Sequence, residues 1–84
     1  MGAPTGPVTL TPQEISDLVK RLAEARHDIN NALSLIAAAS ELIRMNPDNT
    51  PKMIGTLNEQ PQRILSCMQK FSTELELRLG TRRP

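Results

Sequence analysis

Apolar residues recur at seven-residue intervals through the first half of the chain. One series consists of large aliphatic residues, and a second series, three positions later, consists mainly of alanine. The two series are Ile15, Leu22, Ile29, Ile36 and Ile43, and Leu18, Ala25, Ala32 and Ala39. Residues spaced by three, four and seven positions share one face of an α-helix. The pattern therefore predicts one continuous helix over residues 11–45.

Signals for the start of this helix stand together at its N-terminal end. Thr11 is able to accept a hydrogen bond from the backbone of Glu14, whose side chain is able to reach back, and Pro12 suits the first helical position. This combination is a capping box, and it predicts a helix that begins here. Residues 1–10 contain two prolines and two glycines among small side chains, so we expect them to form a disordered arm or linker.

A second helix is predicted after a turn. Residues 46–50 read Asn-Pro-Asp-Asn-Thr, a cluster of turn-forming residues. Thr50 and Pro51 repeat the pattern of a capping threonine followed by proline, which predicts a helix over residues 51–79. Gly80 stands where a glycine commonly ends a helix, and the last four residues, 81–84, are expected to form a tail.

The second helix carries an apolar stripe of its own. Its members keep the heptad spacing, and two further leucines broaden it: Ile54, Leu57, Ile64, Met68, Phe71 and Leu75, with Leu65 and Leu79. Pro61 falls on this stripe. Because proline lacks a backbone donor and clashes with the preceding turn, we expect a kink there.

Two helices joined by a short turn form an antiparallel hairpin, which offers only one interface. The stripe on the first helix is wider than that interface, because it is flanked by Val19 and Leu33 on one side and by Leu35 and Leu42 on the other. The predicted fold is therefore all-α, an antiparallel two-helix hairpin that forms a homodimer and thereby a four-helix bundle. The alternative is a bundle completed by a different protein.

Composition narrows the classes of partner and ligand. The chain has 10 Lys+Arg against 9 Asp+Glu, and Phe71 is its only aromatic residue. Nucleic-acid surfaces cluster cations and aromatic rings, so no nucleic-acid partner is expected. The single Cys67 and the single His27 are far apart in the sequence, and no metal site is predicted. The longest apolar run, residues 35–39, is too short to cross a membrane, so we expect a cytoplasmic protein without membrane contact.

The candidate chemistry centres on His27, which the heptad places opposite the apolar stripe, facing water. Asp28 follows directly, and Asn31 lies one turn later on the same face. A carboxylate beside an imidazole is able to hold one ring proton and leave the other nitrogen free as a nucleophile. Glu24 and Ser34 extend this polar strip at spacings of three and four residues.

The string His27-Asp28-Ile29-Asn30-Asn31-Ala32-Leu33 resembles the H-box of the dimerisation and histidine phosphotransfer domain of sensor histidine kinases. The family pattern is histidine, an acid, an apolar residue, a polar or basic residue, Thr or Asn, often proline, and leucine. The resemblance covers residues 12–79, with a capped long helix, an exposed histidine in its first half, a short turn and a second amphipathic helix. The heptad phase, the hairpin and the string agree, as a motif in its expected context should.

The resemblance implies a function in two-component signalling. By resemblance, His27 accepts a phosphoryl group from ATP and passes it to an aspartate of a response-regulator receiver domain. Asp28 accepts the proton of the histidine, and Asn31 positions water when the same domain dephosphorylates its partner.

The resemblance also implies that the receiver docks on both helices beside the histidine, toward the turn. Leu35 and Leu42 are the apolar residues available there, although packing in the core of the dimer is an equally good explanation for both. Counting symmetrically about the turn places Lys70 near His27. Together with the polar strip, the residues expected to bind a partner are Glu24, Ser34, Leu35, Leu42 and Lys70.

Two features depart from the family. Ala32 stands where the family often has proline, so the place where the bundle bends is expected to differ. The ATP-binding domain of the family is absent from these 84 residues, so no cofactor is predicted for the chain itself. ATP and Mg²⁺ would come with a separate kinase domain, in cis or in trans, and the chain alone is not expected to be a kinase. The alternative function is a non-catalytic dimerisation or adaptor hairpin in which His27 is merely solvated.

Overall fold

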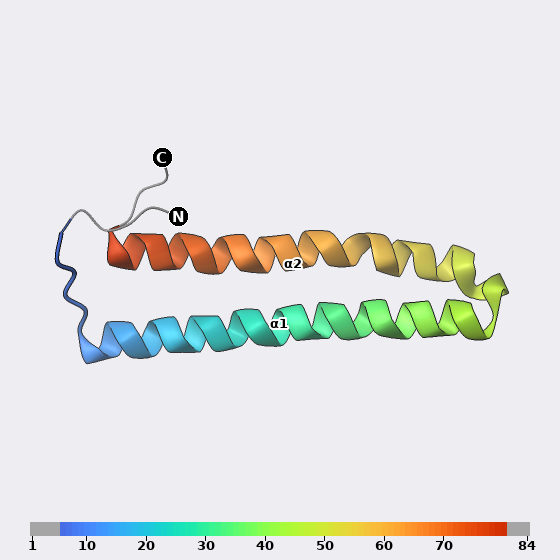
Figure 1. Ribbon diagram of the computed structural model, residues 1–84, viewed down its shortest axis with the longest axis horizontal. Helices are drawn as coiled ribbons and strands as arrows, with labels where there is room; N and C mark the ends of the chain where they lie inside the picture. Colours follow the sequence, from blue (N-terminus) through green and yellow to red (C-terminus); the bar gives the residue numbers. More distant parts are fainter. Residues whose placement is uncertain (1–5, 81–84) are drawn as a thin grey trace.

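The computed structural model describes residues 6–80, which form a hairpin of two long helices (Figure 1). The elements in chain order are α1 (Pro12–Met45), the short 3₁₀ helix η1 (Pro47–Asn49) and α2 (Thr50–Leu79). The helices run antiparallel, side by side, and the described residues contain no strand. The predicted all-α hairpin is confirmed. Of the predicted arm and tail, residues 1–5 and 81–84 lie outside the described residues.

The capping box predicted for α1 is present. The Thr11 side chain accepts a hydrogen bond from the backbone N–H of Glu14 at 3.1 Å, and the Thr11 backbone N–H donates to the Glu14 carboxylate at 3.1 Å. Both bonds satisfy donors that a helix start leaves without intrahelical partners. The bond from the Thr11 backbone is the main cause that holds the pKa of Glu14 below its ordinary value.

Side chains of the turn close the hairpin. The backbone N–H of Asn46 donates to the Leu42 carbonyl at 3.1 Å, and the Asn46 side chain accepts from the N–H of Asp48 at 3.1 Å. The prediction that Thr50 caps the second helix is wrong. Its hydroxyl instead donates to the Pro47 carbonyl at 2.7 Å, and α2 already begins at Thr50, preceded by η1.

α2 is helical on both sides of Pro61 and ends before Gly80, which has a φ of 66°. Glycine adopts this left-handed conformation without the Cβ clash of other residues, so the predicted end is confirmed. The predicted place of Pro61 on the seam is wrong for the hairpin, because its side chain is exposed and the neighbouring Gln60 is 1 % exposed. α2 is thus rotated so that Gln60, and not Pro61, faces inward.

The most buried part of the hairpin is a set of three residues near its middle. Ala32 and Ala39 of α1 are 0 % and 2 % exposed, and with Gln60 they are the only buried residues among those the structure describes. Asp28 of α1 and Cys67 of α2 line the same cavities, so they lie opposite each other. Because the helices run antiparallel, Gln60, seven residues before Cys67, lies opposite the stretch of α1 between Ala32 and Ala39. Gln60 is hydrogen-bonded within its own helix, donating to the Thr56 carbonyl at 2.9 Å. Small side chains on α1 thus leave room for a long, satisfied polar side chain on α2.

The end of the hairpin opposite the turn is joined by ion pairs of Arg78. Its guanidinium lies 3.7 Å from the Glu14 carboxylate and 3.9 Å from that of Asp17, both on α1, and 3.3 Å from Glu74 on its own helix. These side chains are about one-third exposed (30–41 %), where each such pair contributes little to stability. The pairs nevertheless fix which turn of α2 lies beside the start of α1.

The hairpin is a single layer with two different faces. It measures 57 × 28 × 13 Å, and its radius of gyration is 17.9 Å, against about 12 Å for a compact domain of this length. In an antiparallel pair, residues that directly follow inward-facing residues lie on one side of the hairpin, and residues that directly precede them lie on the other. Six exposed large apolar residues lie on the first side, which we call the apolar face: Val19, Leu22, Leu33, Ile54, Leu65 and Met68. Five of them directly follow half-buried or buried residues, whereas Leu22 follows the exposed Arg21 and belongs to this face because it lies one turn after Val19.

The small size of Ala39 is required by the packing of the two helices. Ala39→Leu adds a bulky side chain where the wild-type residue is 2 % exposed, and overpacking of this kind costs about 1–3 kcal/mol. Ala38→Leu is the matched control, because Ala38 is exposed on the same turn and a surface substitution changes stability by only about 0.5 kcal/mol. Urea denaturation followed by circular dichroism should show a lower midpoint for Ala39→Leu alone. Equal midpoints for the two variants would contradict the packing described above.

Candidate functional site on the polar face

His27 projects from the middle of α1 into solvent. Its side chain is 74 % exposed, and its Nδ1 atom lies 3.6 Å from Oδ1 of Asp28, whose side chain is 59 % exposed. This distance is longer than a hydrogen bond, so the contact is electrostatic. The ring therefore turns Nδ1 toward the carboxylate and leaves Nε2 accessible. This Nε2 atom is the position at which a nucleophilic imidazole would react.

The rest of the predicted polar strip also lies on the surface of α1. Asn31 and Ser34 are exposed and follow His27 toward the turn. Glu24 precedes it by one turn, and its carboxylate accepts a hydrogen bond from the Arg21 guanidinium at 3.3 Å. The negative charge of Glu24 is thus partly neutralised by Arg21 of the same helix. The Asn31 amide remains available to a ligand beside the imidazole.

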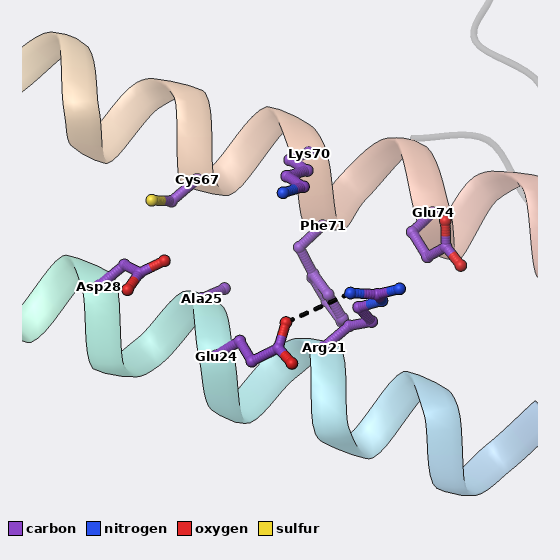
Figure 2. A pocket seen from close by; sticks show the side chains of 8 residues that line it. All are labelled: Arg21, Glu24, Ala25, Asp28, Cys67, Lys70, Phe71 and Glu74. Atoms are coloured by element: carbon purple, nitrogen blue, oxygen red, sulfur yellow. Dashed lines mark hydrogen bonds and ion pairs between the residues drawn. The ribbon is translucent and has the colours of Figure 1, made fainter.

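A groove of about 270 Å³ lies between the two helices next to this strip (Figure 2). α1 and α2 contribute four residues each: Arg21, Glu24, Ala25 and Asp28, and Cys67, Lys70, Phe71 and Glu74. The Phe71 ring extends from α2 toward α1, and the Lys70 side chain also points across the gap (Figure 2). The groove therefore has an apolar floor and a charged rim.

The groove lies on the side of the hairpin opposite the apolar face, and we call this side the polar face. Asp28 directly precedes the inward-facing Ile29, and Lys70 directly precedes Phe71. Lys70 forms no ion pair within the described part of the chain. Asp28 and Glu24 also line a shallow hollow that contains His27, so two carboxylates connect the imidazole with the groove.

The apolar residues expected to bind a partner lie farther toward the turn. Leu35 and Leu42 are 41 % and 42 % exposed, and both follow Asp28 at steps of seven residues, so they belong to the polar face. The structure thus brings His27, Asp28 and Glu24 together and places Lys70 on the other side of the groove, opposite Glu24 and Ala25 (Figure 2). Neither leucine lines the groove or the hollow.

Sequence reasoning missed the part of α2 that completes the groove. Phe71 was expected only as a member of the apolar stripe, and Cys67 was considered only as a metal ligand, yet both line the groove beside Asp28. The sequence did contain a signal for the groove. Arg21, Asp28 and Lys70 each directly precede an apolar residue of the stripe, which places all three on the same side of the hairpin.

Within residues 6–80, no group of three or more His, Cys, Asp or Glu side chains is arranged to hold a metal ion. Neither described helix combines the length and the apolar character that crossing a membrane requires.

Comparison with known proteins gives no match. No family model, no curated protein and no solved structure matches this chain. The likeness of residues 27–33 to an H-box therefore stays a prediction from the residues.

Proposed function

We propose that this chain is a histidine phosphotransfer and dimerisation domain of two-component signalling, with His27 as the phospho-acceptor. The observation that carries the proposal is an exposed imidazole whose Nδ1 faces the Asp28 carboxylate at 3.6 Å while Nε2 is accessible. The H-box-like string and the hairpin support the same function. The described residues thus offer a nucleophile that a large partner is able to reach.

The proposed phosphorylation uses the two ring nitrogens differently. The lone pair of His27 Nε2 attacks the γ-phosphorus of ATP, a nitrogen–phosphorus bond forms, and the bond from phosphorus to the bridging oxygen breaks, so that ADP leaves. The ring then carries a positive charge and a proton on Nδ1. Asp28 stabilises this charge and accepts the proton.

The second proposed step returns the imidazole to its starting state. A carboxylate oxygen of an aspartate on the receiver attacks the phosphorus, the nitrogen–phosphorus bond breaks, and an acyl phosphate forms on the receiver. Nε2 recovers its lone pair, Asp28 returns the proton to Nδ1, and the ring is again neutral. Asn31, one turn beyond His27, is placed to hold a water molecule when this acyl phosphate is hydrolysed.

ATP and Mg²⁺ are supplied by a kinase domain, in cis or on another chain. The two carboxylates nearest the imidazole, Glu24 and Asp28, would repel the triphosphate. Metal ions and cationic groups of the kinase domain neutralise that charge in phosphoryl transfer. The hairpin contributes the acceptor and its position, whereas the donor machinery belongs to the partner.

The apolar face is covered by a second copy of the hairpin. A stable domain needs two packed layers, and the hairpin alone is a layer of 13 Å that leaves Leu22 and Leu33 about half exposed. Two such faces placed together form a four-helix bundle. His27 remains on the outside of that bundle, because its side chain is turned away from both the partner helix and the apolar face.

The receiver docks on the polar face, between His27 and the turn. Leu35 and Leu42 supply exposed apolar contacts there, while the amide of Asn31 and the hydroxyl of Ser34 supply polar contacts. Lys70 supplies a cation on the second helix, within the groove. A mixed surface of this kind is typical of transient protein contacts.

The acceptor assignment is tested by phosphorylation of His27. The chain is incubated with ATP and the ATP-binding domain of its kinase, and intact mass is measured before and after mild acid. Wild type should gain one acid-labile phosphate. His27→Gln should gain none, and Asn30→Gln, a matched polar substitution on the same helix, should behave like wild type. A phosphate that remains in His27→Gln would contradict the assignment of His27 as acceptor, and a wild-type chain that gains no phosphate would favour an adaptor function.

The docking assignment is tested with Leu42→Ser. Because Leu42 is 42 % exposed on the polar face, the variant should keep the wild-type melting temperature and accept phosphate normally, but pass it to the receiver more slowly. Ser40→Ala, an exposed position on the same turn, serves as the control. A loss of stability of ~2–3 kcal/mol, the cost of removing a buried leucine, would place Leu42 in the core of the dimer instead.

A further inference from the structure

A shallow hollow on the outer surface of α1 contains His27 and a lysine. Its lining residues all belong to α1: Lys20, Ala23, Glu24, His27 and Asp28. Lys20 is exposed and forms no ion pair within the described residues. The hollow is separate from the groove, although Glu24 and Asp28 line both. Lys20 has no role in the chemistry proposed so far.

The spacing brings the lysine within reach of a group attached to the imidazole. Lys20 precedes His27 by seven residues, which is two helical turns or about 10 Å along the axis. Side chains of a helix lean toward its N-terminus, so both side chains lean the same way, and both line one hollow. The flexible four-carbon stem of the lysine is able to cover the remaining distance.

The negative charges that line the hollow would repel a phosphoryl group, and the lysine is placed to offset that repulsion. A phosphoryl group on Nε2 brings about −1.5 to −2 charges into a hollow that already contains two carboxylates. Glu24 is paired with Arg21 at 3.3 Å, and Arg21 lines the groove and not the hollow. Lys20 is the only cationic side chain that lines the hollow, apart from the imidazole itself.

We infer that Lys20 is the binding group for the phosphoryl group on His27, so that Lys20 and His27 together form a phosphoryl site on one helix. The inference rests on the proposed function only in that His27 carries a phosphoryl group. Lys20 neutralises part of the dianion that Glu24 and Asp28 repel. It thereby favours the phosphorylated state of the domain before the receiver arrives.

The test labels His27 chemically, without a kinase. Phosphoramidate transfers its phosphoryl group to an accessible imidazole: Nε2 bonds to phosphorus, the phosphorus–nitrogen bond of the reagent breaks, and ammonia leaves. The folded chain is labelled in this way, and the pH midpoint of the second ionisation of the phosphoryl group is followed by ³¹P nuclear magnetic resonance. Wild type is compared with Lys20→Met, Lys20→Arg and the control Lys52→Met, which removes an exposed lysine far from the hollow.

Removal of Lys20 should raise the midpoint, because a nearby cation favours the more charged form. A charge about 7 Å away in water changes the midpoint by about 0.4 pH unit at low salt, and the difference should vanish at about 1 M salt, where screening acts within about 3 Å. Lys20→Arg should retain the wild-type midpoint, and Lys52→Met should leave it unchanged.

The inference is overturned if Lys20→Met and wild type share one midpoint at low salt, or if Lys52→Met shifts it equally. Absence of labelling at His27 would contradict the inference and the proposed function together, since the imidazole would then be inaccessible. A labelled domain that shows the Lys20 effect but passes no phosphate to any receiver would contradict only the proposed function.

Discussion

Two helices joined by a short turn share only one surface, and most features of this molecule follow from that constraint. The shared surface is narrow, and only Ala32, Ala39 and Gln60 are buried among the described residues. Leu22 and Leu33 therefore remain about half exposed after the hairpin has formed. Burial of apolar area is the main favourable term in folding, so the hairpin gains much of its stability only when a second layer covers the apolar face.

Because the two helices share only one surface, the two faces of the hairpin differ in what they are able to bind. If the apolar face is occupied by a second copy, the polar face with its groove stays open to other partners. His27 then lies on a rigid helix, outside the bundle, with Asp28 at one ring nitrogen and Lys20 in the lining of the same hollow. Positions on a helix are held more exactly than positions on a loop, as the proposed phosphoryl transfer between two other proteins would require.

The heptad pattern, the capping box and Gly80 predicted both helices, the start of α1 and the end of α2, because these signals act within one segment of chain. The rotation of α2 could not be predicted in the same way. The apolar stripe of α2 is so wide that either Met68 or Cys67 was able to face inward. In the structure Cys67 and Gln60 face inward, where the small alanines of α1 lie opposite them. The groove was missed for the same reason, since it depends on how residues of α1 and α2 meet.

The most direct test of the account is the oligomeric state of the chain and of two matched variants. Leu22 and Leu35 are similarly exposed, at 49 % and 41 %, but lie on opposite faces of the hairpin. Sedimentation equilibrium should give a dimer for wild type and for Leu35→Asp, and a monomer or an unfolded chain for Leu22→Asp, because an unpaired charge in an apolar interface costs several kcal/mol. A wild-type chain that sediments as a stably folded monomer, or equal dissociation of both variants, would contradict it.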